Sequence, residues 1–234
     1  MSRENKIYTA RVTGGSAGIG KAIVEKLIDN GFIVAVLART KANLAKLKKG
    51  VNNPEACFIY PCDVSNKTEL ESSLTSVVNE LGHIDILVNN AGVFIPGRIS
   101  EEKEGIYEQT MKTNMDSAYY ATRKVLPSLL KGGYIFNICS TASIIGYPNG
   151  GSYCISKFAL LGFTKALRLE LMDKIAVSAI LPGATYTQSW SGTTEPKTRF
   201  IKPEDIAEAL WAAWQIRQNT VMEEIVLRPH LGDF

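Results

Sequence analysis

Three polar side chains in the segment CSTASIIGYPNGGSYCISK, residues 139–157, have types and spacing that suit proton transfer. Tyr153 and Lys157 are four residues apart in a predicted helix, so both side chains project from one face, one turn from each other. Ser140 closes the predicted strand before that helix. A phenol beside an ammonium group can donate or accept a proton, and a nearby hydroxyl can hydrogen-bond an oxygen that gains negative charge.

For the phenol to exchange protons near neutral pH, its surroundings must lower its pKa. An unperturbed tyrosine has a pKa of about 10, and lowering it by about 3 units requires roughly 4 kcal/mol of preference for the phenolate. A lysine cation about 5 Å away contributes on the order of 3 kcal/mol at an effective dielectric constant near 20. In an arbitrary sequence, however, the same residues would be a core aromatic, a surface cation and a turn cap. The neighbouring motifs are therefore needed to distinguish a catalytic role from a structural one.

Near-continuous apolar runs of strand length alternate with stretches of helical periodicity along the chain. The predicted strands are residues 7–12, 33–38, 84–89, 134–139 and 177–181 with a closing strand at 224–229, and the predicted helices are residues 19–30, 43–49, 67–81, 107–130, 152–172 and 203–218. Strands that are apolar on both faces belong in a parallel sheet covered on both sides. The sequence therefore predicts an α/β fold: a Rossmann-type doubly wound parallel sheet of about seven strands, in three α/β/α layers, with ligands beyond the carboxyl ends of the strands.

Length and composition bound the possible classes of protein. A chain of 234 residues with 45% hydrophobic and 21% charged residues can bury one large core, so we expect a single domain over residues 1–234. The irregular stretch 184–202 is longer than most connections and is a candidate substrate-binding lid. The formal charge of +3 is small and the basic residues are scattered, which argues against a nucleic-acid partner.

The sequence carries no signal for a membrane or a metal. No apolar stretch approaches the roughly 20 residues of a membrane span and the first residues are polar, so we expect a cytoplasmic protein without a membrane partner. The 4 cysteines lack CxxC spacing. They are therefore expected to be free, mostly buried thiols, with no metal site.

A glycine-rich turn, TGGSAGIG at residues 13–20, follows the first predicted strand and opens the first predicted helix. Gly14 permits a tight turn, Gly18 lets the backbone approach a pyrophosphate, and Gly20 allows the helix to pack on the sheet. The helix N-terminus supplies N–H donors and the positive end of a dipole. Strand, turn and helix together predict a dinucleotide-binding site.

The sequence resembles the short-chain dehydrogenase/reductase family in its GxxxGxG glycine spacing, in NNAG at residues 89–92, and in the serine, tyrosine and lysine described above. The resemblance covers almost the whole chain and extends to 3-oxoacyl-carrier-protein reductases and broad-specificity ketone reductases. It implies hydride transfer between a nicotinamide and a carbonyl carbon. Tyr153 would act as general acid or base, Lys157 would lower its pKa and hold the nicotinamide ribose, and Ser140 would bond the carbonyl oxygen. Asn114 matches the family asparagine that helps to hold a water between the lysine and solvent.

The end of the second predicted strand indicates which cofactor is used. An acidic residue about 20 positions beyond the glycine turn binds the ribose of NAD, whereas an arginine accommodates the 2′-phosphate of NADP. Here Ala38 takes the place of the acid, and Arg39 offers a planar guanidinium group to phosphate oxygens, with Thr40 and Lys41 as possible helpers. NADP(H) is therefore expected rather than NAD(H), although an exposed loop arginine would look the same.

The resemblance also implies further cofactor contacts. They comprise the phosphate turn at Ser16 and Ile19, the adenine pocket at Asp63 and Val64, the loop beside the ribose at Asn90, Ala91 and Gly92, the nicotinamide pocket at Pro182 and Gly183, and its carboxamide at Thr185 and Thr187.

We therefore expect an NADPH-dependent oxidoreductase that reduces a ketone or aldehyde reversibly. A small-molecule substrate with an apolar body is expected from the side chains near the site, which are Ile144, Ile145, Tyr147, Tyr186, Trp190 and Trp211. The alternative is a non-catalytic NADP-binding sensor, which would not need the serine, tyrosine, lysine and asparagine together. Family members are commonly dimers or tetramers, so the resemblance implies a homo-oligomer, with a tetramer favoured.

Overall fold

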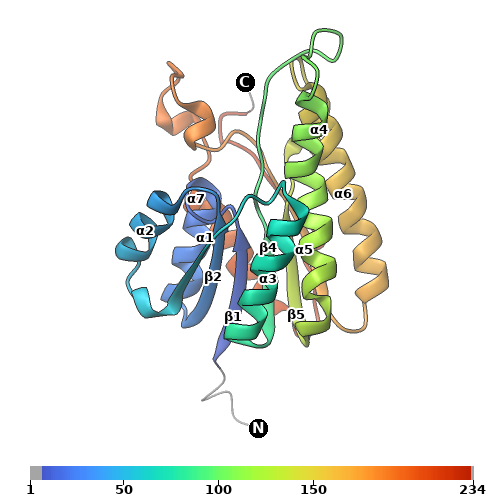
Figure 1. Cartoon of the computed structure of the whole chain (residues 1–234). Coiled ribbons are helices and arrows are strands. Elements are labelled where there is room, and N and C mark those ends of the chain that lie inside the picture. Colours follow the sequence, from blue (N-terminus) through green and yellow to red (C-terminus); the bar gives the residue numbers. More distant parts are fainter. Residues whose placement is uncertain (1–6, 233–234) are drawn as a thin grey trace.

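The computed structural model of the chain describes residues 7–232, whose centre is one parallel sheet with the strand order β3-β2-β1-β4-β5-β6-β7 (Figure 1). The strands are β1 Tyr8–Thr13, β2 Phe32–Ala38, β3 Cys57–Pro61, β4 Ile84–Asn89, β5 Leu129–Ile138, β6 Ala176–Pro182 and β7 Glu224–Leu227. Every pair of neighbours is parallel. The expected sheet of about seven strands is confirmed.

Helices cover both faces of this sheet (Figure 1). They are α1 Gly18–Asp29, α2 Lys41–Gly50, α3 Lys67–Leu81, α4 Ile106–Met111, α5 Ser117–Val125, α6 Gly151–Leu171 and α7 Pro203–Ile216. Leu27 of α1 and Leu210 of α7 share one buried cluster with the sheet, whereas Leu74 of α3 and Leu167 of α6 belong to a second cluster. The structure thus has the three layers that the alternating pattern predicts.

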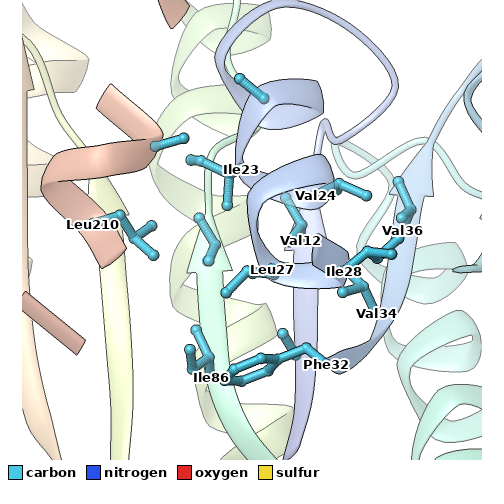
Figure 2. Packing of buried hydrophobic residues seen from close by; sticks show 14 of the residues in the cluster. Val12, Ile23, Val24, Leu27, Ile28, Phe32, Val34, Val36, Ile86 and Leu210 are labelled. Atoms are coloured by element: carbon cyan, nitrogen blue, oxygen red, sulfur yellow. The ribbon is translucent and has the colours of Figure 1, made fainter. Parts of the chain in front are cut away.

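Helix α1 packs on the sheet through one apolar stripe (Figure 2). Ile23, Val24 and Leu27 are each 0% exposed. They belong to the same buried cluster as Val12 of β1 and Leu210 of α7. Fully burying side chains of this size contributes roughly 1.5–3 kcal/mol each. This packing fixes the first turn of α1, and with it the glycine-rich turn, at the end of β1.

The strand order reverses between β1 and β4. The chain moves outward from β1 to β2 and β3, then returns to the other side of β1 with β4 and continues through β5, β6 and β7. In doubly wound sheets, ligands bind beyond the carboxyl ends of the strands at such a reversal. A ligand site is therefore expected at the loops that follow β1 and β4.

The helix expected at residues 107–130 is wrong only beyond residue 125. Helix α4 passes through a π-helical turn, Lys112–Asp116, into α5, which ends at Val125. A short 3₁₀ turn containing Pro127 follows, and β5 begins at Leu129 rather than at residue 134. Pro127 has no N–H group to donate to the carbonyl of Arg123, so the α-helical hydrogen-bond ladder cannot continue through it.

Two other elements differ from the simple pattern. Strand β3 lies at the edge of the sheet and is only partly buried, and it was not among the predicted strands although its residues 57–60 are apolar. In β1, Arg11 is 0% exposed, and its Nε and Nη1 atoms have no hydrogen-bond partner within residues 7–232. Burial lowers the pKa of Arg11 to about 10, and the nearby Tyr60 and Asp85 offset only part of this effect.

The described part of the chain contains neither a membrane-spanning helix nor a cluster of metal ligands. No helix within residues 7–232 is long and apolar enough to cross a membrane. The same residues contain no group of three or more histidine, cysteine or acidic side chains that could hold a metal ion. Cys57, Cys62, Cys139 and Cys154 are all free thiols, and the first three are buried.

Candidate active site

A cavity of about 890 Å³ lies at the carboxyl edge of the sheet. Apart from Asn114 and the possible helper Lys41, every catalytic and cofactor-binding residue expected from the sequence lines it: Gly14, Ser16, Gly18, Ile19, Gly20, Arg39, Thr40, Asp63, Val64, Asn90, Ala91, Gly92, Ser140, Tyr153, Lys157, Pro182, Gly183, Thr185 and Thr187. These residues come from the loops after β1 to β6 and from α6. The fold therefore brings together segments that are far apart in the sequence.

The glycine-rich turn is bonded directly to the loop after β4. Asn90 donates from its side-chain amide to the carbonyls of Thr13 and Gly14 at 2.9 and 3.1 Å. The Thr13 hydroxyl accepts from the backbone N–H groups of Asn90 and Ala91, both at 3.1 Å. These bonds join the two loops on either side of the strand-order reversal.

Close packing explains the glycines at positions 14 and 20. A Cβ on Gly20 would lie 2.4 Å from both the Asn90 side-chain nitrogen and the Gly14 carbonyl. Gly14 has a φ of +66°, and a Cβ there would lie 2.8 Å from the Cα of Ala91. Gly20 is thus needed for contact with the neighbouring loop, not for the helix–sheet packing that the motif predicts.

Tyr153 and Lys157 face the cavity from the first two turns of α6. The Tyr153 ring is partly buried and meets the Phe94 ring edge-on, with 4.9 Å between ring centroids. The side chain of Lys157 is only 4% exposed, and its Nζ donates to the carbonyl of Ile138 at 2.8 Å. That ammonium lies 5.8 Å from the centre of the Tyr153 ring. Phenol and ammonium are therefore neighbours, as their spacing in the sequence predicts.

Burial dominates the protonation of both groups. The pKa of Tyr153 is raised by burial above its usual value, and a hydrogen bond with Ser140 offsets part of this rise. Burial lowers the pKa of Lys157 to about 8. The expected lowering of the phenol pKa by Lys157 is therefore absent from the protein by itself, because the desolvation of the phenol outweighs its favourable contacts. The chain holds Tyr153 as a protonated phenol.

Asn114 lies behind the cavity rather than in its wall. It belongs to the π-helical turn and is 1% exposed. Its Oδ1 accepts from the backbone N–H of Val93 at 2.7 Å, while its Nδ2 donates to the Val93 carbonyl at 3.0 Å and to the Ser156 hydroxyl at 2.9 Å. Asn114 thus ties the loop after β4 to the helix that carries Tyr153 and Lys157.

The rim of the cavity after β2 carries Arg39 and Thr40, both exposed, and Asn43 from the first turn of α2. Thr40 precedes the first residue of α2, and its side chain makes no capping hydrogen bond with the described residues. Asn43 was not anticipated, because an exposed asparagine in a helix has no distinguishing pattern in the sequence. This rim therefore presents polar groups without a carboxylate at position 38.

Apolar and aromatic side chains also line the cavity, and one of them, Phe94, contacts the Tyr153 ring. They are Val93, Phe94, Ile145, Tyr147, Pro148 and Trp190. Three residues expected here are elsewhere: Trp211 packs on Phe32 in the core, Tyr186 packs on Phe200, and Ile144 is exposed outside the cavity. Phe94 and Val93 were missed, since no periodicity extends into the loop after β4.

The segment 184–202 closes on itself above the sheet (orange in Figure 1). Tyr186 and Ala184 exchange backbone hydrogen bonds with Ile201, each of 2.9 Å. Between these anchors the segment contributes Thr187 and residues 188–190 to the cavity wall. A role as a lid remains a prediction.

Comparison with known proteins gives the family. The model of the short chain dehydrogenase family matches residues 8–198. This chain belongs to the short-chain dehydrogenase family, which is a family of NAD(P)-dependent oxidoreductases.

Individual relatives span nearly the whole chain. It is 33% identical to a 3-ketodihydrosphingosine reductase of Dictyostelium discoideum over 95% of this chain and 72% of that protein. It is 32% identical to a sepiapterin reductase of Chlorobaculum tepidum over 95% of this chain and 96% of that protein.

Solved structures share the fold as well. An alcohol dehydrogenase from Thermococcus sibiricus in complex with 5-hydroxy-NADP superposes with a TM-score of 0.88 and 28% identity, covering 96% of this chain and 97% of that one. A 3-ketoacyl-(acyl-carrier-protein) reductase from Brucella melitensis in complex with NADH gives a TM-score of 0.86 and 26% identity, covering 94% and 96%. The expected resemblance to such reductases is confirmed.

The lowered pKa of Lys157 predicts a pH dependence of stability. Between about 8 and 10.5 the folded chain binds fewer protons at this lysine than the unfolded chain does, so the free energy of unfolding rises with pH in this window. Without added ligand, we expect wild type to gain about 2 kcal/mol relative to Lys157→Met between about pH 7 and pH 10. Chemical denaturation of both proteins at the two pH values measures this difference. The same pH dependence in both proteins would contradict the lowered pKa.

Proposed function

We propose that this protein is an NADPH-dependent oxidoreductase that reversibly reduces a ketone or aldehyde carbonyl to an alcohol. The observation that carries the proposal is the meeting of Ser140, Tyr153 and Lys157 in the same cavity that the glycine-rich turn lines. Bound NADPH would supply a hydride to the carbonyl carbon. The protein's own part is then to hold the carbonyl, provide the proton and exclude water.

The first turn of α1 fits the phosphates of a dinucleotide. No side chain of the described residues caps this helix, and its first turn contains no acidic residue. Its N–H groups and the positive end of its dipole are thus available to an anion beside Ser16 and Gly18, which line the cavity. We propose that the cavity residues named from the sequence hold the rest of the cofactor, from Asp63 and Val64 to Thr185 and Thr187.

The preference for NADP(H) rests on the rim after β2. One similar structure holds 5-hydroxy-NADP and another holds NADH, so this fold accepts both kinds of cofactor and the side chains at this rim have to decide. Ala38 presents no carboxylate that would repel a 2′-phosphate, and Arg39 is exposed at the cavity edge. A guanidinium group can bond phosphate oxygens in a bidentate manner.

The proton-transfer roles follow from the protonation of the two buried groups. The raised pKa keeps Tyr153 protonated, which is the form that can donate a proton to the oxygen of a carbonyl being reduced. Ser140 is 8% exposed and lines the cavity, where its hydroxyl can bond the same oxygen. Lys157 remains mostly charged near neutral pH, since its pKa is about 8. Its positive charge favours the phenolate that proton donation leaves behind.

The substrate is proposed to carry an apolar, preferably aromatic body next to its carbonyl. The cavity that Tyr153 faces is also lined by the rings of Phe94, Tyr147 and Trp190 together with Val93 and Ile145. Each ring can bury a large apolar area against a ligand. An aromatic ketone should therefore be a better test substrate than a small polar aldehyde of equal reactivity.

Replacing the proton donor tests the proposed reaction. Tyr153→Phe should lower kcat by about 10²- to 10⁴-fold, because general acid catalysis contributes on that order. NADPH binding should change little, since the aromatic ring is kept. The measurement is NADPH oxidation with a panel of ketones and aldehydes, with Tyr107→Phe, outside the cavity, as the matched control. Undiminished turnover by Tyr153→Phe would reject the proton-transfer role, and NADPH binding without any turnover by wild type would favour the sensor.

Removing the guanidinium group tests cofactor preference. Arg39→Ala should raise KM for NADPH by about 10- to 100-fold, the effect of losing a charge-assisted hydrogen bond. KM for NADH should stay within about twofold, because NADH lacks the 2′-phosphate. Lys46→Ala, on the exposed side of α2, serves as the control. Equal effects of Arg39→Ala on both cofactors would show that Arg39 does not read the phosphate.

Self-association is proposed from the exposed side of α6. Ile155, Phe158 and Leu169 are 40%, 47% and 71% exposed there, which is much apolar surface for one helix. We propose a dimer or tetramer in solution, and light scattering should report at least twice the monomer mass of 25.6 kDa. A monomer at all concentrations would contradict this.

A cytoplasmic location is also proposed, supported by the four free thiols, and cell fractionation tests it.

A further inference from the structure

The connection between β4 and α4 is docked onto the start of α6 (Figure 1). Gly97 forms an isolated parallel bridge with Gly150, and its N–H donates to the carbonyl of Asn149 at 3.0 Å. A few residues on, the carboxylate of Glu102 accepts from the backbone N–H of Ser152 at 2.8 Å and from the Ser152 hydroxyl. This second contact reaches the residue immediately before Tyr153.

Glu102 provides a capping group for the N-terminus of α6, which has none of its own. The helix has Gly150 before its first residue, makes no capping hydrogen bond from that position, and has no acidic residue in its first turn. Its length of 21 residues gives it a full helix dipole with unpaired N–H groups at the start. The Glu102 carboxylate therefore serves as an N-cap brought in from another part of the chain, with Ser152 2% exposed beneath it.

The backbone around this carboxylate is adapted to it. Gly151 has a φ of +29°, and a Cβ there would lie 2.0 Å from Glu102 Oε1 and 2.6 Å from the Gly97 carbonyl. A Cβ on Gly97 would in turn lie 3.2 Å from Cγ of Glu102. Gly97 and Gly151 thus leave room for the Glu102 side chain, and a larger residue at either position would disturb its contact with α6.

We propose that Glu102 is a positioning residue for Tyr153: its carboxylate holds the first turn of α6 and sets the field at the phenol. This inference rests on the proposed function of Tyr153. The loop that carries Glu102 also places Phe94 edge-on against the Tyr153 ring. One loop therefore contacts the tyrosine from its ring side and from the backbone before it.

The charge and the hydrogen bonds of Glu102 have separable effects. The hydrogen bonds order the backbone of the turn that carries Tyr153, and misplacing a reacting group by about 1 Å can lower a rate by about 10²-fold. The negative charge opposes the helix dipole and so disfavours a phenolate near the start of the helix. The other titratable groups that face Tyr153 are Cys139, Cys154, Tyr147 and Lys157, and none of them is altered in the variants below.

Three variants separate these effects. Glu102→Gln keeps an acceptor for the Ser152 N–H and a polar partner for its hydroxyl but removes the charge, whereas Glu102→Ala removes both. Glu101→Gln is the matched control, since Glu101 is 66% exposed and its carboxylate pairs with the exposed Arg98. All three are made in the full chain.

Hydrogen exchange is measured first, because it needs no substrate. We expect peptides covering residues 150–156 to exchange at least about tenfold faster in Glu102→Ala, and to match wild type in Glu101→Gln. Unchanged exchange in Glu102→Ala would overturn the inference, whatever the enzyme assays give.

Kinetics are then measured with the best carbonyl and alcohol from the substrate panel. We expect kcat to fall by on the order of tenfold in Glu102→Ala with NADPH affinity kept. In Glu102→Gln, we expect kcat within about threefold of wild type. The pKa that governs alcohol oxidation should move down by about 0.2 to 0.7 unit, the size of a helix-terminus charge effect.

The outcomes distinguish this inference from the proposed function. Faster exchange with unchanged kcat and pH profile would leave Glu102 a structural cap only and would reject the positioning role. Wild-type turnover by the Tyr153→Phe enzyme would instead reject the proposed function. A pH profile that is unshifted in Glu102→Gln would reject the field effect of the carboxylate.

Discussion

The candidate site depends on holding the Lys157 ammonium away from bulk water. A charge that is 4% exposed destabilises a fold unless polar groups surround it, and the lowered pKa of Lys157 records this penalty. The carbonyl of Ile138 at the end of β5 accepts from the ammonium. Gly92 adjoins it on another side, since a Cβ there would lie 3.7 Å from Nζ. Lys157 can therefore be buried only when β5, the loop after β4 and α6 are all in place.

Amide side chains provide that order beneath the site. Asn89 of β4 donates to Asn137 of β5 at 2.8 Å and to Thr122 of α5 at 3.1 Å, and Asn137 donates to Thr164 of α6 at 2.8 Å. These buried bonds run across the sheet and into the helices on one face. A polar network inside a core is stable in few arrangements, which gives the strands and α6 a defined relation to one another. With Asn114 fixing Val93 as well, the loop after β4 has little freedom.

The sequence predicted the sheet and the convergence of its motifs because both follow from general rules. Parallel strands place all their carboxyl ends at one edge, so the glycine-rich turn, Ser140 and the helix with Tyr153 had to meet there. Features without a repeating pattern could not be predicted. The sequence of the π-helical turn does not distinguish it from an ordinary helix. Whether the Trp211 side chain points into the core or into the cavity depends on the packing of α7. Glu102 reaches α6 from an irregular loop, which has no repeating pattern. The sign of the Tyr153 pKa shift depends on burial, which spacing does not specify.

Burial shifts the pKa values of Tyr153 and Lys157 in opposite directions. A raised pKa at Tyr153 makes the protonated phenol the resting form, and a pKa of about 8 at Lys157 leaves both forms of the lysine accessible near neutrality. In the proposed reduction, the phenol gives up its proton and must regain one before the next turnover. Lys157, one helical turn away, is an acid weak enough to stay charged at rest and strong enough to release a proton to a phenolate whose pKa is higher. Because burial places the pKa of Lys157 below that of Tyr153, the proposed reaction would return the proton from the lysine to the tyrosine.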